Sequence, residues 1–278
     1  MNISRLPLAA ALAAMTGWLP VAAQEAPKPD IPADLLEDPH VREELAINEF
    51  TAPSIARIFE SLEALAPLPT LKFQRETPAN MPMNRADLAV ELGFLIADGF
   101  LVVQAGELGK VESLAADLTR YGKGLGAGER VNRHAASLLE SARKQDVVQL
   151  KKELAATQKD VELELVSLRD ADLAHLISLG GWIRALQVSS SAVDTQFSPE
   201  RARHIMREDI ADYYSGVISG LEPQISERKT FLDMVEILSE LRTEMVLDGQ
   251  PATHPQITEI TSQAANLAKL ALQREESP

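Results

Sequence analysis

The chain has 278 residues, of which 45% are hydrophobic, 24% charged and 4% aromatic, and its formal net charge is −14. The negative charge argues against binding to nucleic-acid phosphates or to anionic membranes, and the absence of cysteine excludes a disulfide framework. A composition rich in Ala, Leu and Glu and poor in aromatic residues predicts helices rather than sheets.

The first residues predict a secretory signal. Arg5 supplies a short positive start, residues 6–19 form an apolar stretch, and residues 21–23 are small enough for a signal peptidase. The apolar stretch is too short to span a bilayer comfortably, and Pro20 ends it. We therefore expect cleavage near Ala23, export to the periplasm or beyond the cell, and no transmembrane span in the mature chain.

The next part of the chain, residues 24–83, predicts an arm that precedes the main body. It divides into a proline-rich flexible leader at 24–33, a helical arm at 33–66 with helices near 32–50 and 53–66, and a linker at 67–83 with four prolines. The linker either separates the arm from the body or lies as an ordered loop on it through Leu71 and Phe73.

The main domain is predicted over residues 84–278. Asn84 is a good N-cap, and residues 84–104 are apolar nearly all round, as expected for a central helix. Further helices are predicted at 107–122, 128–144, 146–168, 171–193, 198–219, 229–247 and 255–275. Short breaks between them favour antiparallel neighbours, so the predicted fold is all-α: a multi-helix bundle of eight to ten mostly antiparallel helices.

Three carboxylates share one face of the predicted central helix: Asp87, Glu91 and Asp98. On an apolar helix they are candidates for acid–base chemistry or for binding a cation. The alternatives are a narrow stripe facing solvent, or salt bridges to arginines such as Arg85 or Arg184.

A second unusual feature is residues 179–184, LGGWIR. The paired glycines permit a kink or a tight helix crossing. Trp182, the only tryptophan after the predicted signal, either lines a ligand pocket with Arg184 as an anion contact or fills the core. The candidate ligand-binding residues are therefore Glu91, Asp98, Trp182 and Arg184.

Motifs of known chemistry are absent or incomplete. Asp172 and His175 form one half of a di-metal pattern, without the partners that such a site needs. Residues 122–128, GKGLGAG, fit a loose dinucleotide pattern but follow a helix, so they are better explained as a helix end at Gly122, Gly124 or Gly126. Residues 189–191 are serines without a nucleophile-elbow context. We predict no catalytic residue, metal or cofactor.

The leading functional prediction is a non-enzymatic periplasmic or secreted protein that binds a protein partner or scaffolds an assembly of the cell envelope. One alternative is a small-molecule or cation-binding protein with a pocket between helices. A second is an enzyme that uses a buried carboxylate of strongly raised pKa. The sequence leaves the partner and the oligomeric state open.

Overall fold

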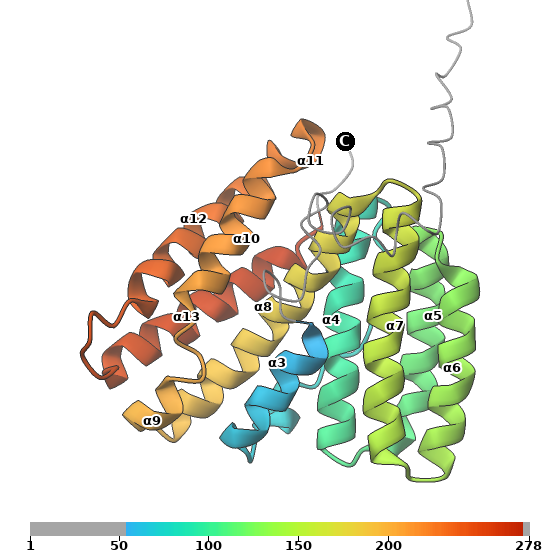
Figure 1. Cartoon of the computed structure of the whole chain (residues 1–278), viewed down its shortest axis with the longest axis horizontal. Helices are drawn as coiled ribbons and strands as arrows, with labels where there is room; N and C mark the ends of the chain where they lie inside the picture. Colours follow the sequence, from blue (N-terminus) through green and yellow to red (C-terminus); the bar gives the residue numbers. More distant parts are fainter. Residues whose placement is uncertain (1–53, 275–278) are drawn as a thin grey trace, which may run out of the picture.

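The longest helix, α8 (Ala171–Thr195), lies between two groups of antiparallel helices in the computed structural model, which describes residues 54–274 (Figure 1). The first group is α4 (Arg85–Gln104), α5 (Val111–Leu125), α6 (Gly128–Arg143) and α7 (Val147–Ser167), and the second is α10 (Glu208–Gly220), α12 (Lys229–Met245) and α13 (His254–Ala271). The short helix α3 (Ile55–Leu62) packs on α8, α4 and α7. Residues 54–274 also contain two four-residue helices, α9 (Pro199–Ala202) and α11 (Pro223–Ser226), and 3-10 turns at Glu63–Leu65, Thr70–Phe73 and Leu108–Lys110.

The predicted all-α multi-helix bundle is confirmed. Residues 54–274 contain eleven α-helices, nine of them longer than one turn, and no strand. None of these helices is both long and apolar enough to cross a membrane. The predicted signal at 1–23, the leader and the helix near 32–50 lie outside the described residues.

Several helix ends follow the local signals in the sequence. The Asn84 side chain accepts a hydrogen bond from the Ala86 backbone N–H at 2.8 Å and starts α4. Ser198 caps α9 in the same way, with Pro199 in its first turn. Gly126 ends α5 with a φ of 93°, whereas Gly122 and Gly124 lie inside that helix.

The glycines of α4 and α8 allow these two central helices to cross at close range. A Cβ on Gly93 would lie 2.0 Å from the Ile177 carbonyl oxygen, and a Cβ on Gly180 would lie 2.1 Å from the Val90 carbonyl oxygen. No side chain fits at either point. Gly180 thus serves the tight crossing with α4, whereas Gly181 makes room for the Ile55 side chain of α3.

The single helix predicted over residues 198–219 is wrong. The chain forms one turn, α9, and starts again as α10 at Glu208. In one continuous helix Ile205 and Ile210 would point about 140° apart. The break allows both of these side chains to be buried in the core.

The segments on the two sides of residue 84 share one core. Ile55, Phe59 and Leu65 are buried together with the side chains of α4 and α8. Of the two alternatives for residues 67–83, the structure shows the ordered loop: Phe73 packs against the core, whereas Leu71 is 76% exposed and does not hold the loop. The domain boundary at residue 84 itself stays a prediction.

Candidate functional site

All three carboxylates on α4 are engaged by arginines. Asp98 accepts hydrogen bonds from Arg184 Nε at 2.7 Å and from Arg75 Nε at 2.6 Å. Glu91 lies 3.3 Å from Arg274 and 3.9 Å from Arg75, and Asp87 accepts a bidentate pair from Arg228 at 2.8 and 3.0 Å. These contacts are the salt bridges to arginines that the sequence analysis gave as one alternative. Arg184, one of the two arginines suggested there, pairs with Asp98.

The other suggested arginine, Arg85, pairs with Asp170 instead. Arg75, like Arg228 and Arg274, is an arginine that the sequence did not single out. It lies in the proline-rich loop and has no local pattern around it. Its pairing with Asp98 is visible only once the loop is placed on α4.

Arg184 is almost completely buried, and each of its three nitrogens donates a hydrogen bond. The acceptors are Asp98, the Gln187 side-chain oxygen at 2.7 Å and the Phe73 carbonyl. The Phe73 ring also lies 5.8 Å from the guanidinium carbon. Three of the five guanidinium N–H groups are therefore engaged within the protein.

Trp182 lies in the core on the side of α8 that faces α10. It is buried and packs against the Tyr214 ring, with centroids 5.2 Å apart. The structure thus brings Glu91, Asp98 and Arg184 into one network through Arg75, and places Trp182 elsewhere. Their shared role in ligand binding stays a prediction.

The hollow beside this network is small. It has a volume of about 50 Å³ and is bounded by Arg75, Asp98, Phe73 and Lys110, among others. Pockets for small molecules usually measure roughly 300–1,000 Å³. A few water molecules fit beside Asp98, but a metabolite does not.

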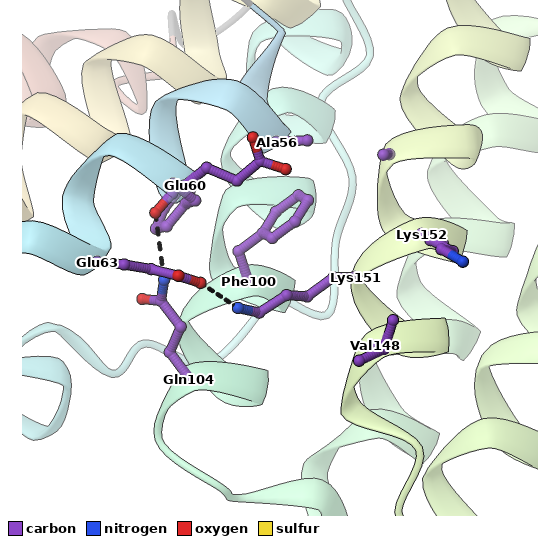
Figure 2. Close-up of a pocket in the computed structure, with 10 residues that line it drawn as sticks. Ala56, Glu60, Glu63, Phe100, Gln104, Val148, Lys151 and Lys152 are labelled. Atoms are coloured by element: carbon purple, nitrogen blue, oxygen red, sulfur yellow. Dashed lines mark hydrogen bonds and ion pairs between the residues drawn. The ribbon is translucent and has the colours of Figure 1, made fainter.

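A larger groove opens between α3 and α7, with α4 as its floor (Figure 2). We call it the α3–α7 groove. Its volume is about 250 Å³. It is lined by Ala56, Phe59, Glu60 and Glu63 of the α3 segment, Phe100 and Gln104 of α4, and Val148, Lys151, Lys152 and Ala155 of α7.

The floor of the groove is aromatic. The rings of Phe59 and Phe100 stack with centroids 5.3 Å apart and planes 10° from parallel. Gln104 donates from Nε2 to the Phe59 carbonyl at 3.4 Å, while its buried Oε1 has no hydrogen-bond partner among the described residues. On the rim, Val148 is 64% exposed. The two rings are only 1% and 2% exposed, so the exposed apolar surface of the groove comes mainly from Val148.

The two sides of the groove carry opposite charges. Glu60 and Glu63 lie on the α3 side, and Lys151 and Lys152 lie on the α7 side. Lys151 reaches across the groove to pair with Glu63, as Figure 2 shows. Such a partly exposed pair contributes less than about 1 kcal/mol, so an incoming charged group can replace it.

Two further polar clusters lie outside the groove. His134 of α6 bridges two carboxylates of α7, with Nδ1 2.9 Å from Glu153 and Nε2 3.1 Å from Asp160. Asp172 and His175 have separate partners, the Glu222 backbone N–H and the Tyr213 hydroxyl. No group of three His, Asp or Glu side chains suited to a metal ion occurs in residues 54–274.

Glu162 of α7 is the carboxylate with the most unusual environment. Burial raises the pKa of its side chain to about 7, although hydrogen bonds from Gln158 at 2.8 Å and Ser178 at 2.9 Å oppose this shift. Gln158 in turn accepts from the Ile55 backbone N–H at 3.0 Å, at the first residue of α3. No pattern in the sequence points to this site, because Glu162 is one of many charges along α7.

Comparison with models of protein families, with curated proteins and with solved structures finds no match to the chain in any of the three. The function must therefore be inferred from the site.

Proposed function

We propose that this protein is exported and acts as a non-enzymatic binding protein in the periplasm or outside the cell. Its partner is a protein that inserts one large apolar side chain into the α3–α7 groove. The observation that carries the proposal is the open groove itself, with two stacked phenylalanines as its floor and an exposed valine on its rim.

The size of the groove supports a side chain as the occupant. Its volume of about 250 Å³ lies below the usual range for small-molecule pockets, roughly 300–1,000 Å³. A cavity of about 150 Å³ already accepts a benzene ring. Aromatic pockets of this kind, surrounded by polar groups, are typical of the few residues that dominate the binding energy of protein interfaces.

The location is supported by the sequence of residues 1–23, which has the positive start, the apolar stretch and the small residues of a secretory signal. A fold without cysteine is compatible with oxidising and reducing compartments alike, because it contains no thiol to be oxidised.

The two alternatives have less support. Binding of a small molecule or cation by Glu91, Asp98, Trp182 and Arg184 would compete with the ion pairs that Asp98 makes with Arg75 and Arg184, and Trp182 lies apart from this network. Acid–base catalysis would rest on Glu162, whose raised pKa is the one observation in its favour. Glu162 lines neither of the two hollows described above.

The test places a photo-crosslinking amino acid at residue 148 of the protein in its native cell envelope. The matched control carries the same group at residue 232, since Leu232 of α12 is 56% exposed and lies far from the groove in sequence. We expect a polypeptide adduct of defined mass from residue 148 only.

The purified adduct partner is then bound to the wild type, to Val148→Asp and to Leu232→Asp. A charge in the groove should weaken binding by at least about tenfold, which corresponds to about 1.4 kcal/mol, whereas the change on α12 should leave the Kd unchanged. If residue 148 gives no adduct, or if Val148→Asp binds as the wild type does, the groove is not the docking site.

A further inference from the structure

The first residue of α3 is held by a side chain of α7. The Ile55 N–H belongs to the backbone donors at a helix start that have no acceptor within the helix, and it donates to Gln158 Oε1 at 3.0 Å. Ile55 is completely buried and Gln158 is 2% exposed, so water does not easily replace this bond. Because Ala56 and Phe59 line the α3–α7 groove, Gln158 fixes the start of its α3 wall.

Gln158 is in turn held by Glu162, one turn further along α7. Gln158 Nε2 donates to Glu162 Oε1 at 2.8 Å, and Ser178 Oγ of α8 donates to the same oxygen at 2.9 Å. An ionised carboxylate can only accept, so it fixes the Gln158 amide with its nitrogen toward Glu162 and its oxygen toward Ile55. A protonated carboxyl accepts more weakly and also carries a donor, so it permits the reversed amide, whose nitrogen would face the Ile55 N–H.

We propose that Glu162 is a pH switch for the α3–α7 groove: its ionised form holds the start of α3 through Gln158, and its protonated form loosens it. The inference rests on the proposed function only in treating the groove as a binding site. The switch itself acts in the free protein and needs no partner. A partner bound against the α3 wall would be held more weakly in acid.

The environment of Glu162 lets it change its charge near neutral pH. Burial raises the pKa of its side chain to about 7, while the residue remains partly exposed, so that a proton can reach it. The hydrogen bond from Gln158 lowers this pKa. The coupling is reciprocal: losing the proton strengthens the bond between Glu162 and Gln158, and gaining it weakens that bond.

The charged groups near Glu162 on α7 pair with side chains of α6. Asp160 binds His134, and Glu164 binds Arg130. The charges of α4 pair with residues outside α7, as described above; they are Arg85, Asp87, Glu91 and Asp98. The remaining charges of this region are exposed to solvent; they are Lys159 of α7 and Arg57 and Glu60 of α3.

The titratable groups on the other side of Glu162 come from α8 and α10. His175 lies one turn before Ser178, and its Nδ1 is 3.3 Å from the Tyr213 hydroxyl. Burial, then Tyr213 and then Glu162 raise the pKa of Tyr214 well above its usual value, so Tyr214 stays neutral. A histidine ordinarily titrates in the same pH range as the proposed switch, so the test has to separate His175 from Glu162.

Hydrogen exchange of the Ile55 amide tests the switch directly. It is measured by NMR from pH 5 to pH 8 and corrected for the intrinsic pH dependence of exchange. Hydrogen bonds to a charged group are roughly twice as strong as neutral ones, so we expect the protection of Ile55 in the wild type to rise at least about threefold over this range. The Gln256 amide, which Thr253 caps at the start of α13, should show no such rise.

Three variants assign the response to its residues. Glu162→Gln cannot ionise, so its Ile55 amide should be equally protected at pH 5 and pH 8. Gln158→Leu lacks the acceptor, so the protection of Ile55 should fall at every pH. His175→Gln should keep the response of the wild type.

The sign of the response separates the switch from a change in overall stability. Global unfolding exposes Glu162 to water, so its raised pKa should make the whole protein less stable at pH 8 than at pH 5, whereas the Ile55 amide should become better protected. Constant or falling protection in the wild type would overturn the proposal. So would a response that persists in Glu162→Gln or disappears in His175→Gln. No partner protein takes part, so the result is independent of the binding test for the proposed function.

Discussion

Asp98 offers the sharpest test of how the loop at residues 70–75 is attached to the bundle. Its carboxylate lies between Arg75 of the loop and Arg184 of α8, with side-chain exposures of 16% for Asp98, 18% for Arg75 and 5% for Arg184. Asp98→Asn keeps the shape of the side chain and removes its charge. The two guanidinium groups then remain close together without the carboxylate between them.

The expected cost follows from the geometry. Asp98 accepts two charge-assisted hydrogen bonds of 2.6 and 2.7 Å, whereas the side-chain amide of the Asp98→Asn variant has only one acceptor oxygen. A hydrogen bond to a charged group contributes about 1.5–3 kcal/mol, and removing one partner of a buried ion pair costs about 3–5 kcal/mol. Since Asp98 and Arg75 are partly exposed, we expect a loss near the lower end, about 3 kcal/mol.

The assay is urea unfolding of the wild type, Asp98→Asn and the control Asp209→Asn. Asp209 also pairs with an arginine, Arg207 at 2.7 Å, but the exposures of these side chains are 62% and 51%, so the control should lose less than about 1 kcal/mol. The slope with urea should stay the same in all three proteins. If Asp98→Asn costs no more than Asp209→Asn, the two arginines do not depend on Asp98 and the reasoning is wrong.

Three further predictions concern the crossing, the carboxylate of Glu162 and the groove. Gly180→Ala should lower the free energy of unfolding by at least about 2 kcal/mol, because its Cβ would clash with a carbonyl oxygen, whereas Gly216→Ala in α10, which has open space around it, should be neutral or stabilising; thermal melting distinguishes the two. A pKa of about 7 for Glu162, above its ordinary value of 4.5, means that the folded state binds the proton more tightly than the unfolded state. That stabilisation is complete below about pH 4.5 and is lost as the pH rises through 7. Between pH 5 and pH 8 the free energy of unfolding of the wild type, measured with urea, should therefore fall by roughly 2 kcal/mol more than that of Glu162→Gln. An equal fall in the two proteins would contradict this prediction. Lys151→Ala removes the bridge to Glu63 and should cost less than about 1 kcal/mol while increasing the binding of a fluorescent apolar dye; unchanged dye binding would show that the bridge does not restrict the groove.

Helix positions were largely predictable, because caps and turns depend on neighbouring residues. Asn84, the pair Ser198–Pro199 and Gly126 act within one helical turn, and each does what its residue type predicts. The break before α10 was not predictable in this way. It depends on the core that receives Ile205 and Ile210, which only the packed helices define.

The candidate site was predictable only in part. The shared face of Asp87, Glu91 and Asp98 follows from helical spacing, and the suggestion that arginines meet them follows from the frequency of structural ion pairs. The pairing of Asp98 with Arg75, the position of Trp182 against Tyr214 and the α3–α7 groove all join residues that are far apart in the chain. Spacing along the sequence carries no information about such contacts.

Local sequence was enough to establish that the chain is helical, where most helices begin and end, and that α4 is central, because these properties arise from hydrogen bonds and apolar periodicity within a few residues. Packing between distant segments was needed to show that the proline-rich loop is held by Asp98, that the glycines bring α4 and α8 together, and that a groove remains between α3 and α7. The reason is physical: a groove is the space that three packed helices fail to fill, and its existence depends on the shapes of side chains from all three of them.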